Sequence, residues 1–199
     1  MNKILSLGIL LIISTLTNAQ DLRHKIRIIN NNLFIEVYVN KKGPYNFIFD
    51  TGASGLCRID KRVAEELHLP IVDSIKNTDG TGNYHIEPVV KMKTLKFGQM
   101  TLKNVESMMR DYNKYIKQGE IRIDGIIGRD FFYDYLLVLD CPNNTLTLSK
   151  DSLRVSSKNV IRYEKAFHIK GRVSDIDTIF NFDTGSVLCM HFPKSIIEN

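Results

Sequence analysis

A short phrase that ends in Asp-Thr-Gly occurs twice in this 199-residue chain. Its first copy is Phe47–Ser54 and its second is Phe180–Ser186, and in both an apolar run leads directly into the aspartate. The two aspartates, Asp50 and Asp183, are 133 residues apart (183 − 50), which leaves room for one small domain between them. Duplication of this kind predicts two similar units that place two carboxyl groups against each other. Two carboxyl groups about 3 Å apart cannot both ionise readily, so they share one proton.

The pattern of apolar residues in the first 150 residues indicates an all-β fold. One short helix is expected over residues 61–68, with Asp60 as its N-cap and Pro70 beyond its end. Strands are expected over residues 33–39, 45–49, 89–95, 101–109, 121–127, 136–139 and 145–148. Many short strands with Gly and Asn turns predict a closed β-barrel.

The N-terminal residues 1–19 have the pattern of a secretory signal peptide. Lys3 precedes an apolar run that is short for a bilayer span, and the small residue Ala19 ends it. An uncleaved anchor is the alternative interpretation. We therefore expect an exported protein, periplasmic or extracellular, with no stable membrane span after cleavage.

The remaining chain is expected to comprise a complete lobe and the beginning of a second one. Residues 24–150 form the first lobe, and the polar residues 151–159 are a candidate linker. In residues 160–199 the pattern of the first lobe starts again and then stops, so this second lobe is incomplete. Either the chain is a piece of a longer two-lobed protein, or the first lobe forms a homodimer.

Charge and cysteine content argue against several other classes of protein. Without residues 1–19, which hold one Lys and no acid, the formal charge falls from +5 to +4, and no block of like charges suggests a nucleic-acid partner. Neither a Cys-x-x-Cys nor a His-Glu-x-x-His motif is present, so we predict no metal and no cofactor. Cys57 and Cys189 occupy matching places in the two repeats, and packing or a disulfide would explain this; Cys141 is the third cysteine.

A further motif, Asp124–Phe132 (DGIIGRDFF), follows the first Asp-Thr-Gly at a distance. Together with Phe47–Ser54 it resembles the retropepsin-like aspartic proteases, a group related to the pepsins. The resemblance covers about residues 30–150 as one lobe and 160–199 as the start of a second.

This resemblance implies roles for individual residues. Asp50 and Asp183 would be the catalytic pair. The supporting residues of their loops would be Thr51, Gly52, Thr184, Gly185 and Ser186, with Thr51 bonded across to the facing loop. Ile126, Ile127 and Gly128 would be the strand that crosses under the loop, and a flap would carry Gly80, Gly82 and Tyr84. For Tyr84, an ordinary half-exposed strand position is the alternative.

The residue that follows each Asp-Thr-Gly differs between the two loops. Ala53 stands in the first loop and Ser186 in the second. Because a hydroxyl bonded to a carboxylate favours its charged form, we expect Asp183 to carry the charge and Asp50 the shared proton.

The function that these features predict is an aspartic endopeptidase acting on polypeptides. Its second aspartate is Asp183 in a single chain, or Asp50 of a second copy in a homodimer. The alternative is a protein of the same fold that binds peptides without cleaving them, because its second lobe is incomplete.

Overall fold

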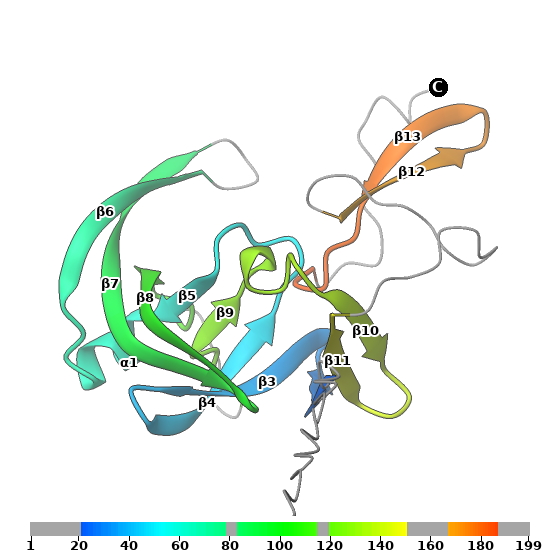
Figure 1. Ribbon diagram of the computed structural model, residues 1–199. Helices are drawn as coiled ribbons and strands as arrows, with labels where there is room; N and C mark the ends of the chain where they lie inside the picture. Colours follow the sequence, from blue (N-terminus) through cyan, green and yellow to red (C-terminus); the bar gives the residue numbers. More distant parts are fainter. Residues whose placement is uncertain (1–20, 79–82, 115–119, 151–166, 187–199) are drawn as a thin grey trace, which may run out of the picture.

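A computed structural model describes residues 21–78, 83–114, 120–150 and 167–186 (Figure 1). The predicted signal peptide, the predicted linker, Gly80, Gly82 and Cys189 lie outside these residues.

Strands account for most of the described residues, as expected. They are β1 (Leu22–Lys25), β2 (Arg27–Ile29), β3 (Asn32–Val39), β4 (Lys42–Phe49), β5 (Cys57–Asp60), β6 (Ile71–Thr78), β7 (Tyr84–Phe97), β8 (Met100–Arg110), β9 (Gly125–Ile127), β10 (Leu136–Asp140), β11 (Thr145–Ser149), β12 (His168–Val173) and β13 (Ile176–Asn181). The α-helix α1 (Lys61–Glu66) and a 3-10 turn (Arg129–Phe131) are the helical elements of the described part.

Six strands of the main sheet form a closed ring in the hydrogen-bonded order β3, β4, β9, β5, β8 and β7. The pairing of β3 with β7 joins the two ends of this order, with Val37 opposite Phe97. Inside the ring the apolar faces of the strands form the main core, which includes the fully buried Phe47, Phe49 and Met92. The closed sheet predicted from the sequence is therefore confirmed.

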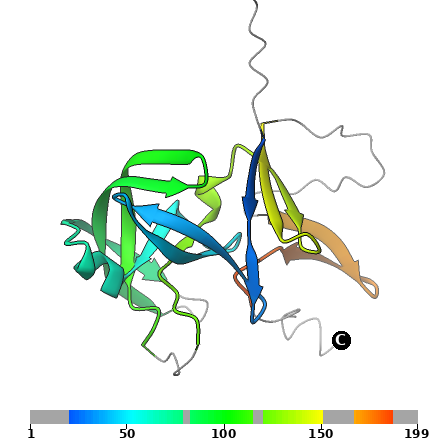
Figure 2. The same cartoon turned by 90° about the horizontal axis from the view of Figure 1, so that it is seen from below.

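Two further strands extend the ring at its sides, and a second sheet lies next to it. β2 pairs with β3, and β6 pairs with β7 in a long hairpin that reaches beyond the ring (Figure 1). β1, β11 and β10 form a separate three-stranded sheet, seen as the dark blue and yellow strands beside the ring (Figure 2). The antiparallel hairpin β12–β13 precedes Asp183 in the chain as β3–β4 precedes Asp50.

Several boundaries differ from the expected ones. The strand predicted over 121–127 is limited to Gly125–Ile127, because the side chain of Asn113 takes both backbone hydrogen bonds of Ile123. The helix ends at Glu66, and His68 has a positive φ of 48°. Its predicted N-cap is confirmed, since the Asp60 carboxylate accepts the Arg62 N–H at 3.1 Å. The short strands β1 and β2 and the edge strand β6 were not predicted as strands.

Candidate active site

Asp50 directly follows β4. One further backbone hydrogen bond extends the parallel pairing of β4 with β9 to this residue. Its N–H donates to the carbonyl oxygen of Ile127 at 3.0 Å. The next residue of the β9 segment, Gly128, runs close under the Asp50 loop: a Cβ at this position would lie 2.9 Å from the Ala53 carbonyl oxygen. Gly128 N–H also donates to the Leu56 carbonyl at 3.1 Å. The structure therefore places Ile126, Ile127 and Gly128 beneath this loop, where the resemblance puts the crossing strand.

The two Asp-Thr-Gly loops meet face to face and are joined by their threonines. Thr51 N–H donates to Thr184 Oγ1 at 3.1 Å, and Thr184 N–H donates to Thr51 Oγ1 at 3.0 Å. Each hydroxyl in turn donates to a carbonyl of the opposite chain segment, Thr51 to Phe182 at 2.6 Å and Thr184 to Phe49 at 2.7 Å. Both threonines are buried. Four hydrogen bonds made by these buried threonines fix the relative position of the loops.

The carboxyl groups of Asp50 and Asp183 are held by the amides of their own loops. Asp50 Oδ1 accepts the N–H groups of Gly52 at 2.8 Å and Ala53 at 2.9 Å. Asp183 Oδ1 accepts the Gly185 N–H at 2.9 Å. Each glycine also faces the opposite aspartate, because a Cβ on Gly52 would lie 2.5 Å from either carboxylate oxygen of Asp183. The two carboxyl groups are thus immediate neighbours.

Burial and the neighbouring acid raise the pKa of Asp50. Desolvation is the largest cause, the negative charge of Asp183 is the second, and a hydrogen bond with the Asp183 carboxyl adds to them; together they raise the pKa of Asp50 to about 6. The amides of Ala53 and Gly52 oppose this effect. In this arrangement a proton on Asp50 is therefore favoured. The arrangement can supply a carboxylic acid and a carboxylate at the same place.

Comparison with known proteins agrees with this geometry. Residues 35–131 match the family model described as aspartyl protease. This lobe of the chain is therefore similar to the aspartyl protease family. A search of curated proteins found no match.

Similar solved structures include two aspartic proteases. A retropepsin-like aspartic protease from Rickettsia conorii is 18% identical over 65% of this chain and 89% of its own, with a TM-score of 0.43. Aspartic proteinase from Irpex lacteus is 14% identical over 70% of this chain, with a TM-score of 0.37. This chain spans about half of the Irpex protein, at 49%.

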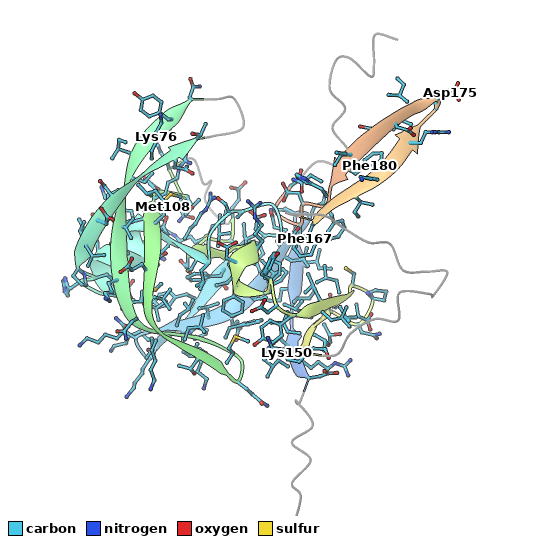
Figure 3. The ribbon with its side chains drawn as sticks, turned by 45° about the horizontal axis from the view of Figure 1, so that its top comes forward. Lys76, Met108, Lys150, Phe167, Asp175 and Phe180 are labelled. Atoms are coloured by element: carbon cyan, nitrogen blue, oxygen red, sulfur yellow. The ribbon has the colours of Figure 1, made fainter. Side chains whose placement is uncertain are left out.

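Of the residues predicted as a flap, Tyr84 is described, and it lies on the β6–β7 hairpin. The pairing of β6 with β7 shows which side chains lie on the same face of the hairpin, because residues directly opposite each other share a face. Tyr84 is 60% exposed and lies opposite Thr78, and the Lys76 ammonium sits 3.9 Å from the centre of its ring, near the end of the hairpin (Figure 3). Its role in a flap stays a prediction, as do the catalytic roles of the loop residues.

The opposite face of the hairpin holds side chains that the sequence analysis did not select. Asn77 pairs with His85 and Ile75 pairs with Glu87, so these four share one face. His85 and Glu87 line a cleft of about 860 Å³, and Ile75 and Asn77 line another of about 390 Å³ beside residues 54–58. β6 and the first residues of β7, Tyr84–Ile86, are largely exposed on both faces, so no burial pattern in the sequence revealed this division.

Ser186 donates its N–H to the Asp183 carbonyl at 3.3 Å. The predicted bond from its hydroxyl to the Asp183 carboxylate stays a prediction.

The remaining predictions concern metals, thiols and membranes. Within the described residues, no group of three or more His, Cys, Asp or Glu side chains could hold a metal ion. Cys57 and Cys141 are free thiols, and burial raises the pKa of Cys57 to about 12. No helix in the described part of the chain is long and apolar enough to cross a membrane.

Proposed function

We propose that this protein is an aspartic endopeptidase that hydrolyses peptide bonds with a water molecule held between Asp50 and Asp183. The observation that carries the proposal is the reciprocal contact of the two loops, which brings one carboxyl group with a raised pKa next to a second carboxyl group. The match of residues 35–131 to the aspartyl protease family model supports the same reaction class.

In the proposed mechanism the two carboxyl groups exchange roles within one cycle. The Asp183 carboxylate accepts a proton from the water as its oxygen attacks the peptide carbonyl carbon, and Asp50 donates its proton to the carbonyl oxygen. The resulting gem-diol breaks at its C–N bond. Asp183 then gives its proton to the leaving amine, while Asp50 takes a proton from one hydroxyl of the gem-diol. One proton remains on the pair, as at the start.

We also propose that the protein works outside the cytoplasm, since residues 1–19 have the pattern of a secretory signal peptide. Its partner would be an unfolded or extended polypeptide.

The experiment is cleavage of an unfolded protein substrate at mildly acid pH over a dilution series, with Asp50→Asn and Asp183→Asn as matched controls. Specific activity that is constant on dilution and lost in both variants supports an intramolecular pair. Activity that falls on dilution and survives in Asp183→Asn supports a homodimer with two copies of Asp50. Absence of cleavage, with peptide binding retained, supports the alternative of a binding protein.

A further inference from the structure

The larger cleft is connected to the loop that carries Asp50 through a shared apolar cluster. Its apolar wall includes Phe34, Ile121 and Ile123, which pack in one cluster with Ala53. Ala53 is also the residue whose N–H holds the Asp50 carboxylate at 2.9 Å. A side chain bound in the cleft would therefore rest on the same small core that supports the proposed catalytic loop.

The cleft has an acidic group in its more sheltered part. The side chain of Glu87, on the cleft-lining face of β7, is only 15% exposed. Among the described residues its ion-pair partner is Arg110, whose Nε lies 3.7 Å from Glu87 Oε1. This separation is too long for an N–H···O hydrogen bond. A carboxylate shielded from water in this way is stabilised by a donor group that reaches it directly.

The charges around the cleft favour a cation over an anion. Among the described residues, its lining includes three carboxylates, Glu87, Asp111 and Glu120, two cations, Arg110 and Lys114, and the imidazole of His85. An apolar floor with an excess of carboxylates above it suits a long side chain that has an aliphatic stem and a positively charged end.

We propose that this cleft binds an arginine or lysine side chain of the substrate and that Glu87 selects it. The proposal rests on the function proposed above, because it concerns a peptide bound next to Asp50. The aliphatic stem lies on Phe34 and Ile123, and the cationic end bonds to the Glu87 carboxylate.

Binding tests this proposal independently of catalysis. In the Asp50→Asn variant, fluorescence anisotropy would measure the affinity at pH 7.5 for peptides that differ at one central position: Arg, Lys, Gln, norleucine or Glu. We expect the Arg and Lys peptides to bind about tenfold more tightly than the Gln and norleucine peptides, and the Glu peptide to bind most weakly.

Substitutions at Glu87 test whether its carboxylate causes the preference for Arg and Lys peptides. Glu87→Gln should remove most of the preference for Arg and Lys, whereas Glu87→Asp, which keeps the charge, should retain part of it. Glu36→Gln is the matched control, because Glu36 is an exposed residue on β3 outside this cleft. Equal affinity for all peptides, a preference for the Glu peptide, no binding of any peptide, or an unchanged preference in Glu87→Gln would each overturn the proposal.

Cleavage-site mapping with the unsubstituted protein separates this inference from the proposed function. Cleavage without enrichment of Arg or Lys near the cut would leave the endopeptidase standing and refute the basic-side-chain pocket. A preference in binding without any cleavage would support the pocket and refute the endopeptidase.

Discussion

Gly52 lies directly against the carboxylate of Asp183, with space for no side chain between them. The relationship is reciprocal, since a Cβ on Gly185 would lie 2.6 Å from Oδ1 of Asp50. The Gly of each Asp-Thr-Gly motif therefore sets how closely the opposite carboxyl group can approach.

Gly52→Ala should abolish most activity, because the added methyl group would push the Asp183 carboxyl group away from Asp50. We expect a loss of at least about 100-fold in kcat/KM, as for other displacements of about 1 Å at a reacting centre. Gly55→Ala is the matched control: Gly55 has a φ of 81° and nothing within 4 Å of its Cβ position, so this change costs about 1 kcal/mol of stability through backbone strain and leaves the carboxyl pair in place. Equal loss of activity in both variants would contradict the argument.

Thr51→Val and Thr184→Val should each lower both stability and activity. Each change removes a buried hydroxyl that donates one hydrogen bond and accepts another, at a cost of about 2 kcal/mol in the free energy of unfolding. Because the two threonines bond to each other, the effects should be non-additive in a double-mutant cycle measured by urea denaturation. Additive effects would mean that the two threonines are not coupled. Thr51→Ser is the control: it keeps the hydroxyl and should retain most of the stability.

Activity should decline as the pH rises through about 6, because Asp50 then loses the proton that it donates. The free energy of unfolding should also fall as the pH rises over this range. The folded pKa of Asp50 lies above its ordinary value, so the folded state binds more protons than the unfolded state between about pH 4 and 6. The contribution of this group is therefore most favourable below pH 4 and is lost up to about pH 6, a change of at most about 3 kcal/mol.

Asp50→Asn checks the cause of this pH dependence. The variant cannot ionise at this position, so its free energy of unfolding should fall less between pH 4 and 6 than that of the unsubstituted protein. Parallel pH curves from chemical denaturation of the two proteins would assign the effect to other groups.

Asp124→Ala should destabilise the lobe by about 2 kcal/mol. Asp124 is 5% exposed, accepts the Asn46 N–H at 2.8 Å and forms an ion pair with Arg62 of α1. Its removal leaves both donors without this acceptor. Asp130→Ala, at an exposed position of the same motif, is the control and should change the unfolding midpoint little.

The sequence was sufficient for those parts of the fold that repeat or alternate. Asp50 at the end of an apolar strand and Asp60 as a helix cap follow from local patterns, and the structure places them accordingly. The position of Gly128 under the loop came from the resemblance, and the structure agrees with it. The contact of Thr51 with the facing loop came from the resemblance and not from any local pattern.

Features that depend on register or on long-range side-chain bonds were not predictable. Whether Tyr84 or His85 faces the cleft depends on the pairing of β6 with β7, and a shift by one residue would exchange the two faces. The end of the predicted strand near Ile123 depends on Asn113, whose amide replaces a neighbouring strand.

The bonds between the threonines also have a consequence for the order of folding. Thr51 is synthesised early, but its hydrogen-bond partners Phe182 and Thr184 follow 131 and 133 residues later. Contacts of such long range form late, after the loop between them has closed. A nascent chain can thus fold its first barrel while the proposed pair of carboxyl groups is still unassembled. The topology itself would therefore delay the proposed activity until the second loop has been made.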